Sequence, residues 1–186
     1  MRVRFVTSNE GKFREAGLYL EPYGVELEQV TVGYPEIQAE TLEEVARYGA
    51  DVLARRMDRF IIEDSGFFLD AQGGFPGVYS KFVHATIGLE GILRLVGDDR
   101  RAHFESCILY HDGVPHIFRG DVRGHVAEEP RGTGGFGYDP IFVPEGHDRT
   151  FAEMEPEEKN ALSHRGRALA ALAAFLAERT GVRNGR

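Results

Sequence analysis

Acidic side chains in the first half of the chain could hold a metal ion or accept a proton. Glu36 lies in the segment YPEIQAE, and Glu63 and Asp64 follow the apolar residues FII. Mg²⁺ prefers one or two carboxylates together with water and phosphate oxygens, and a carboxylate near others can act as a general base. The Ser65-Gly66 pair predicts a sharp turn after a strand. We therefore expect Asp64 to be functional and Glu63 to face water at the strand end.

The polar residues 7–12, TSNEGK, could bind an anion. They separate a short apolar strand from a helix, so that backbone N–H groups and the positive helix end point into one space. Thr7 and Asn9 could donate hydrogen bonds, and Lys12 adds a full charge. The segment is not a Walker A loop, because no glycine stands five residues before Gly11 and Phe13 follows Lys12. Taken alone, it also fits an ordinary capped helix with a solvated lysine.

Residues 132–140, GTGGFGYDP, combine glycines with flat aromatic side chains. Glycine allows unusual backbone angles and the close approach of a ligand. Phe136 or Tyr138 could stack on a base, an interaction that contributes about 1–3 kcal/mol. A surface loop whose aromatic residues enter the core explains the composition equally well.

The run EKNALSHRGRA, residues 158–168, places polar side chains beside an apolar helix. On one continuous helix Lys159 and Ser163 would be four residues apart, as would Asn160 and His164. His164 and Arg165 could then donate hydrogen bonds to carbonyl oxygens of a base. A solvated helix start with Ser163 as N-cap is the alternative. Ser163 and His164 do not indicate a hydrolase triad, because adjacent residues do not place nucleophile and base correctly.

Periodic patterns predict the elements that must position these segments. Strands are expected at 3–8, 25–32, 59–71 (interrupted by the turn), 102–112 and 114–126, the last two joined by a turn at Asp112-Gly113. Helices are expected at 10–20, 41–57, 88–96 and, as one helix or two, 156–181. Thr41 and Glu44 have the spacing of a capping box. This mixture predicts an α/β fold with a mixed sheet, in a single domain of residues 1–186.

Composition argues against several classes of protein. The net charge of −8 disfavours nucleic acid as a partner, because duplex binding usually needs a basic excess. No apolar run approaches the ~20 residues that cross a bilayer. The apolar part of the N-terminus is too short for a signal peptide, so we expect a cytoplasmic chain with no membrane partner. Cys107, the only cysteine, is expected to be a buried apolar residue, and CxxC-type zinc sites are excluded.

Lysine is scarce in this chain. Among 22 basic residues, the lysines are Lys12, Lys81 and Lys159. Lysine is a compact point charge that suits phosphate, whereas arginine favours planar bidentate pairing. The three lysines are therefore candidates for contacts with a small anionic substrate, although so few residues also fit chance in an arginine-rich sequence.

The ordered set of segments is more specific than any one of them. TSNEGK, the PE pair at 35–36, EDSG at 63–66, GFGYDP at 135–140 and SHR at 163–165 occur in this order. From about Phe5 to Leu176 the chain resembles the inosine triphosphate pyrophosphatase family, the non-standard purine nucleotide pyrophosphatases. The resemblance implies an elongated two-lobed α/β fold around a long mixed β-sheet with flanking helices. It also implies a nucleotide cleft between the lobes, and a homodimer.

The resemblance further implies a reaction and the roles of residues. Members of this family hydrolyse (d)ITP, XTP and similar nucleotides to the monophosphate and pyrophosphate with Mg²⁺. By this likeness Glu36 and Asp64 bind the metal, Asp64 is the general base (directly or through a water on the metal), and Phe136 stacks on the purine. Lys81 matches a phosphate-binding lysine of some members, and Tyr48 stands where others carry another. The remaining substrate contacts implied are Thr7, Ser8, Asn9, Glu10, Gly11, Lys12, Ser65, Gly137, Tyr138, Asp139, Lys159, His164 and Arg165.

Three other functions remain open from the sequence. The first is a nucleotide pyrophosphatase of broader substrate range, including pyrimidines, which a substrate panel would separate. The second is a non-catalytic nucleotide-binding protein on the same fold, against which Lys12, Glu36 and Asp64 argue. The third is a single-strand nucleic-acid binder that uses the aromatic loop, which the net charge disfavours.

Overall fold

The computed structural model describes residues 1–35 and 37–180 of the 186-residue chain. Its strands are β1 (Arg2–Val6), β2 (Glu26–Val30), β3 (Phe60–Leu69), β4 (Pro76–Gly77), β5 (Arg101–His111), β6 (Pro115–Val126) and β7 (Phe142–Pro144). Its α-helices are α1 (Glu10–Leu20), α2 (Leu42–Leu53), α3 (Ser80–Leu95), α4 (Pro156–Leu162) and α5 (His164–Thr180). Short 3-10 turns lie at Glu21–Tyr23, Asp70–Gln72, Asp139–Ile141 and Phe151–Glu153. None of these helices has both the length and the apolar character needed to span a membrane.

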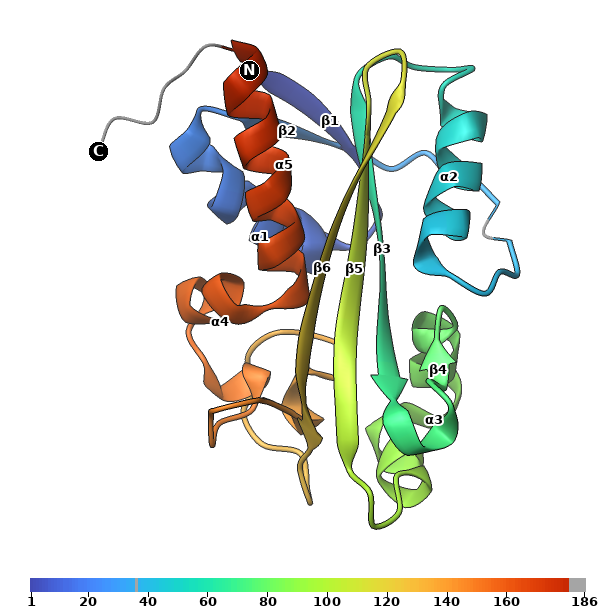
Figure 1. The fold of residues 1–186 in the computed structure, drawn as a ribbon, viewed down its shortest axis with the longest axis vertical. Coiled ribbons are helices and arrows are strands. Elements are labelled where there is room, and N and C mark those ends of the chain that lie inside the picture. The colour runs from blue at the N-terminus through green and yellow to red at the C-terminus, as the bar shows by residue number, and fades with distance from the viewer. Residues whose placement is uncertain (36, 181–186) are drawn as a thin grey trace.

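One mixed sheet of seven strands runs through the molecule. Its order is β2-β1-β3-β5-β6-β7, with β4 paired to β3. β1 is parallel to β2 and β3, whereas β3, β5 and β6 are antiparallel. The three long strands follow the long axis of the molecule, with α1, α2 and α5 toward one end and α3 and β4 toward the other (Figure 1). The predicted α/β class, mixed sheet and elongated shape are confirmed.

Side-chain alternation along β3 builds a separate core on each face of the sheet. Ile61 packs with α1 and α5, in a cluster that includes Phe5, Ile108 and Leu172. Its neighbours Phe60 and Ile62 belong to a second cluster beneath α2. Helices α5 and α2 accordingly lie on opposite sides of the long strands (Figure 1). Each position of β3 thus has a defined face, which decides where its polar residues point.

β3 is one continuous strand, and the prediction of a sharp turn at Ser65-Gly66 was wrong. Ser65 is opposite Ser106 and Gly66 is opposite Glu105, in an unbroken antiparallel register with β5. The ladder with β5 supplies partners for the backbone across the whole segment, so these two residues stay extended. Asp64 therefore lies in the middle of a strand and not at its end.

Most other predicted elements are confirmed, with one helix placed incorrectly. The helix expected at 88–96 is the second half of α3, which begins at Ser80 and is kinked at Gly88, where φ is +63°. In the first half Val83 is buried whereas Phe82 and Ile87 are exposed, so this half lacks a continuous apolar face against the core. By contrast, α1 has the predicted bounds, and Thr41 and Glu44 form the predicted capping box of α2.

Cys107 on β5 is buried, as predicted. Burial raises the pKa of its thiol to about 12, and the nearby carboxylate of Asp64 acts in the same direction. The thiol therefore stays protonated and unreactive at neutral pH.

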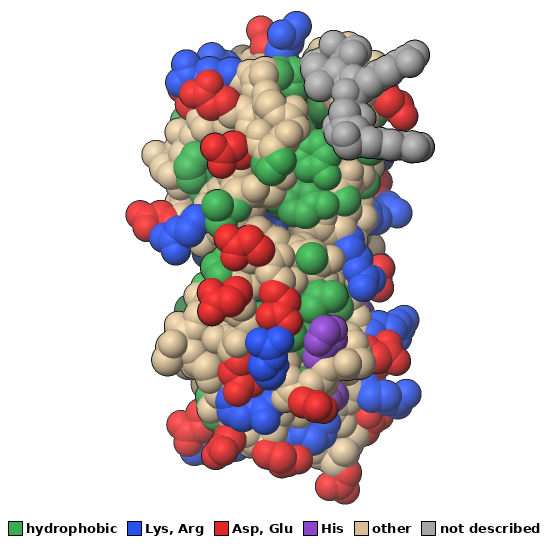
Figure 2. Space-filling model, turned by 90° about the vertical axis from the view of Figure 1, so that its left-hand side faces the viewer, with side chains coloured by type: hydrophobic (Ala, Val, Ile, Leu, Met, Phe, Trp, Pro, Cys, Tyr) green, Lys and Arg blue, Asp and Glu red, His purple; other side chains and the backbone are tan. Residues whose placement is uncertain are grey.

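The surface over α1, α4 and α5 carries charges of both signs. On the face shown in Figure 2, acidic and basic side chains are interspersed over the lower half and apolar side chains gather toward the upper end. This mixture differs from the continuous basic surface that favours binding to a nucleic-acid duplex.

Candidate active site

A cleft of about 580 Å³ opens at one edge of β3. β1 pairs with β3 at Phe60 and Ile61, and β4 pairs with it at Phe67 and Phe68. Between these contacts, residues 62–66 have no strand neighbour on that edge within the described parts of the chain. This gap leaves a stretch of β3 open to the cleft, whose volume suits a small-molecule ligand.

Most of the expected substrate contacts line this cleft. They come from the β1–α1 connection, the middle of β3, the first turns of α3 and α5, and the loop before β7. They are Thr7, Ser8, Asn9, Lys12, Asp64, Ser65, Lys81, Phe136, Gly137, Tyr138, Asp139, His164 and Arg165. The fold therefore brings together segments that lie far apart in the sequence.

Four expected residues are not among those lining the cleft. Glu36 lies outside the described residues. Glu10 is exposed in the first turn of α1, and Gly11 packs against the ring of Phe136. Lys159 is 3% exposed and lies behind the cleft.

The turn between β1 and α1 has the predicted form of a capped helix start. Asn9 is the N-cap, and its Oδ1 accepts a hydrogen bond from the N–H of Lys12 at 3.0 Å. Oγ1 of Thr7 accepts another from the N–H of Asn9 at 3.1 Å. The side chain of Lys12 reaches the open edge of β3, where Nζ donates to the carbonyl oxygen of Glu63 at 3.0 Å. The cap thus directs a cation into the cleft.

The loop that carries Phe136 is fixed to the rest of the protein. The N–H of Phe136 donates to Oδ2 of Asp139 at 2.7 Å, and the hydroxyl of Tyr138 donates to the carbonyl of Ser80 at 2.7 Å. Nζ of Lys159 lies 4.9 Å from the centre of the Phe136 ring, and Cζ of Arg165 lies 5.2 Å from it. Cation–π contacts of this kind hold an aromatic ring in place. The ring is half-buried at the cleft wall.

Helices α4 and α5 are separate, and Ser163 lies between them in an extended conformation, with φ −72° and ψ 159°. Lys159 and Ser163 therefore do not share a face of one helix. Oγ of Ser163 accepts a hydrogen bond from the N–H of Gly166 at 3.1 Å, which caps α5 and places His164 and Arg165 in its first turn. Ser163 thus caps the helix, as one alternative predicted, but the expectation of a solvated helix start was wrong because the side chains of His164 and Arg165 are buried.

His164 is a neutral residue at neutral pH. Burial lowers its pKa well below the ordinary value of 6.5, and the charge of Arg165 adds to this effect. Its ring stacks on Phe104 with 4.6 Å between the ring centres. Nδ1 is buried without a hydrogen-bond partner in the described residues, although buried polar atoms are usually paired. A neutral imidazole that lines the cleft in this state can hydrogen-bond to a bound molecule.

In and behind the cleft wall, six buried or half-buried charges alternate in sign. In order of contact they are Lys12, Glu63, Arg165, Glu15, Lys159 and Asp139. Nε of Arg165 donates to Oε1 of Glu63 at 3.0 Å, and NH1 donates to Glu15. Nζ of Lys159 donates to Glu15 at 2.6 Å and to Asp139 at 2.5 Å. These contacts join α1, β3, α4, α5 and the loop of Phe136.

Glu63 does not face water, so that expectation was wrong. Its side chain is 1% exposed, and Oε1 also accepts a hydrogen bond from Oγ of Ser106 at 2.8 Å. Burial alone would raise its pKa, but the charges of Arg165 and Lys12 outweigh burial and lower the pKa to about 2. The carboxylate is therefore ionised throughout the neutral range. Side chains two residues apart on a strand share a face, so Glu63 lies on the same face of β3 as the buried Ile61. This pattern could have predicted the burial of Glu63.

Other residues of the site were not identified from the sequence. Glu15 contacts two predicted residues, Lys159 and Arg165. The sequence signal for its role was its position on α1 three residues after Lys12, on a neighbouring part of the helix surface. The cleft is also lined by Thr31, Val32, Gly33, Tyr34, Val78, Ser80, His84 and Phe104. These residues carry no recognisable motif and become neighbours only through the sheet and the packing of α3.

Comparisons with known proteins extend the likeness over nearly the whole chain. Residues 3–175 match the Ham1 family. The chain is 61% identical over 181 residues to the dITP/XTP pyrophosphatase of Thermococcus kodakarensis, covering 96% of this chain and 98% of that protein. It is 53% identical to the protein of the same name from Pyrococcus horikoshii, covering 95% and 97%. A solved Ham1 protein from Coxiella burnetii has a TM-score of 0.84 at 32% identity, covering 96% and 99%. The chain therefore belongs to the Ham1 family, which confirms the resemblance found in the sequence.

Proposed function

We propose that the chain hydrolyses non-standard purine nucleoside triphosphates, such as ITP, dITP and XTP, to the monophosphate and pyrophosphate. The observation that carries this proposal is that one cleft collects two kinds of group, which we assign to a phosphate end and a base end. Lys12, Lys81 and Asp64 line it together with Phe136 and His164. Cations and a carboxylate suit a triphosphate and an attacking water, whereas a ring and a neutral imidazole suit a purine. The names of the relatives support the same reaction.

At the phosphate end, the chain's own residues supply charge and a base. Lys12, Lys81 and the turn of Thr7, Ser8 and Asn9 hold the triphosphate. Asp64 accepts a proton from the water that attacks the α-phosphorus. The bond from the α-phosphorus to the bridging oxygen breaks, and pyrophosphate leaves with the electron pair. Positive charge fixed beside the leaving group stabilises the charge that develops there.

The residues at this end fit a magnesium ion. The carboxylate of Asp64 lines the cleft. No group of three or more potential ligands gathers among the residues that the structure describes, and Mg²⁺ needs only one or two carboxylates when phosphate oxygens and water complete its shell. We assign Asp64 and Glu36 as its ligands. A bound Mg²⁺ would neutralise phosphate charge.

At the base end, selectivity comes from hydrogen-bond donors. We infer that the guanidinium of Arg165 and the ring of His164, which line the cleft, donate hydrogen bonds to the 6-oxo group. Adenine carries an amino donor at that position, which would leave both donors without an acceptor. A buried site that hydrogen-bonds to one group of the substrate strongly rejects analogues that lack this group. Lys159 and Asp139 support this end from behind, and Gly137 and Tyr138 shape it.

Removing the aromatic ring should weaken binding of every purine nucleotide. Phe136→Ala deletes the face on which the base stacks, a loss of about 1–3 kcal/mol, or about 5- to 150-fold in KM. Steady-state kinetics with ITP measure this change. Phe136→Tyr keeps the stacking face and is the matched control. An unchanged KM in the alanine variant would remove Phe136 from the base site.

Gly11 should influence the base site although it does not line the cleft. A Cβ at this position would lie 2.5 and 2.7 Å from Cδ1 and Cε1 of Phe136, closer than atoms can approach. Gly11→Ala should therefore displace the ring and raise KM for ITP about 10-fold, within the range for partial loss of stacking. Gly17→Ala, on the same helix with nothing within 4 Å of the added atom, is the control and should leave KM unchanged. Equal kinetics for the two variants would contradict this packing argument.

Product analysis tests the proposed reaction. Purified protein with Mg²⁺ is incubated in parallel with ITP, XTP, GTP, ATP and a pyrimidine triphosphate. Monophosphate and pyrophosphate from ITP and XTP, with little from the others, would support the proposal. Comparable turnover of all substrates would favour a pyrophosphatase of broad range. Binding without turnover would indicate a non-catalytic nucleotide-binding protein.

The remaining properties are also proposals. We propose a single cytoplasmic domain that assembles as a homodimer. Phe75, Tyr79 and Phe82 are 41%, 44% and 68% exposed beside the cleft residue Lys81, and large exposed apolar side chains close together are typical of an interface. Light scattering should give about twice the 20.8 kDa mass of one chain, and a monomer mass would contradict the assembly.

A further inference from the structure

One buried carboxylate contacts residues from both ends of the cleft. Oε2 of Glu63 lies 3.3 Å from Nζ of Lys12, and Oε1 accepts a hydrogen bond from Nε of Arg165 at 3.0 Å. In the proposed function Lys12 holds phosphate and Arg165 reads the base. The two cations come from α1 and α5, and Glu63 lies on the strand between them.

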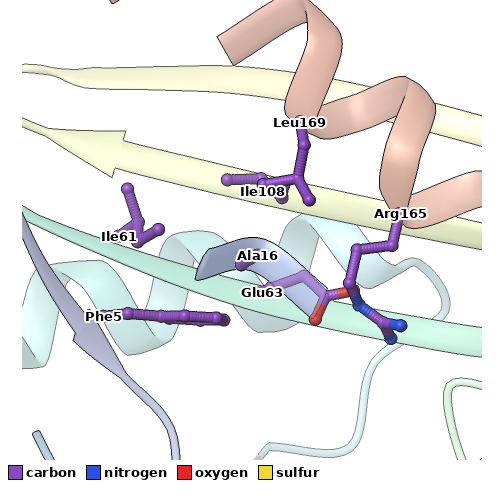
Figure 3. Close-up of a pocket in the computed structure, with 7 residues that line it drawn as sticks. All are labelled: Phe5, Ala16, Ile61, Glu63, Ile108, Arg165 and Leu169. Atoms are coloured by element: carbon purple, nitrogen blue, oxygen red, sulfur yellow. The ribbon is translucent and has the colours of Figure 1, made fainter. Parts of the chain in front are cut away.

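An apolar wall encloses one side of the contact between Glu63 and Arg165. The side chain of Glu63 and that of Arg165 point toward each other beside a wall formed by Phe5, Ala16, Ile61, Ile108 and Leu169 (Figure 3). The gap that these seven residues enclose has no space for a water molecule. On its other side this group borders the cleft, but the side chains of Glu63 and Arg165 are only 1% and 2% exposed. A change in this buried carboxylate should therefore alter a contact of both cations.

We propose that Glu63 is a positioning residue that sets Lys12 and Arg165 in one geometry, so that phosphate binding and base recognition depend on the same carboxylate. This inference rests on the proposed function. Glu63 does not reach the reacting atoms in this role and acts through the two cations. A shift of about 1 Å in a binding group can cost as much as 100-fold in rate, so the loss of a shared anchor should affect both ends.

Two partial ligands separate the two ends experimentally. Inorganic triphosphate with Mg²⁺ reports on the phosphate end by calorimetry, and inosine reports on the base end by ligand-observed NMR. Glu63→Gln has nearly the same shape without the charge. It should weaken binding of both probes about 10-fold or more. If Glu63 only stabilised the fold, Glu63→Gln would lower the melting temperature but would not weaken binding of both probes.

Two variants serve as matched controls. Glu15→Gln removes a carboxylate that contacts Arg165 and Lys159, so it should weaken inosine binding and leave triphosphate binding unchanged. Leu172→Ala removes a fully buried side chain from the core under α5 and should lower the melting temperature with both affinities unchanged. If Glu63→Gln does not fold, Glu63→Asp replaces it. The shorter aspartate keeps the charge but cannot span both cations, so it should still weaken at least one probe while Leu172→Ala weakens neither.

The outcomes distinguish this inference from the proposed function. The inference is supported if the wild-type protein turns over ITP and Glu63→Gln loses affinity for both triphosphate and inosine. If the wild-type protein turns over ITP and binds both probes, but folded Glu63→Gln retains either affinity, the inference alone is overturned. If the wild-type protein binds neither probe and hydrolyses no nucleotide, the proposed function and the inference both fail.

Discussion

Asp64→Asn should lower kcat for ITP by about 10²- to 10⁴-fold, the range that a general base contributes. The amide of asparagine has nearly the shape of the carboxylate but cannot accept the proton of the attacking water. Binding of ITP should largely persist, because the cations and the aromatic ring of the cleft are untouched. Stopped-time product assays give the rate, and calorimetry gives the affinity.

A matched substitution shows whether this effect is specific. Asp51→Asn changes an exposed carboxylate on α2 and should leave kcat unchanged. Full activity in Asp64→Asn would exclude Asp64 as the base. A loss of nucleotide binding as large as the loss of rate would show that Asp64 acts mainly as a ligand of the metal and not as the base.

Arg165→Ala should impair both stability and selectivity. The guanidinium is 2% exposed and contacts Glu63 and Glu15, so its removal takes one of two cations from each of two buried carboxylates. Breaking a buried pair in this way costs about 3–5 kcal/mol of unfolding free energy. The lost charge-assisted hydrogen bond to the base, worth about 1.5–3 kcal/mol, should lower kcat/KM for ITP about 10- to 150-fold. Discrimination between ITP and ATP should fall with it.

Thermal unfolding and kinetics with ITP and ATP measure these two effects separately. Arg167→Ala is the control, because this exposed residue of the same helix donates to a backbone carbonyl at Asp121, away from the cleft. Comparable turnover of ITP by the Arg165 variant would count against the assignment of Arg165 to the base site.

Local features of the fold could be predicted from the sequence because local rules determine them. Asn9 caps α1, and Thr41 with Glu44 caps α2, each through hydrogen bonds within four residues. The long hairpin of β5 and β6 follows from alternation and one turn. The likeness to a known family then assigned residues such as Lys81 and Phe136 to the substrate site. Their local sequence patterns alone did not distinguish a functional from a structural role.

Features that depend on distant partners could not be predicted in the same way. Ser65 and Gly66 resemble a turn locally, but β5 holds them in an extended strand. Glu63 looked like a surface carboxylate because Arg165, which pairs with it, lies 102 residues away. The contact between Glu15 and Lys159 spans 144 residues. Only the packing of α1, α4 and α5 against the sheet reveals these pairs.

The most direct test of the account is the position of water attack. A single turnover of ITP in water enriched in oxygen-18, with Mg²⁺, is followed by mass spectrometry of both products. Attack at the α-phosphorus predicts one labelled oxygen in the monophosphate and unlabelled pyrophosphate. Label in the pyrophosphate would show attack at the β-phosphorus, and release of orthophosphate would show attack at the γ-phosphorus. Either result would contradict the proposed arrangement of Asp64, Lys12 and the triphosphate.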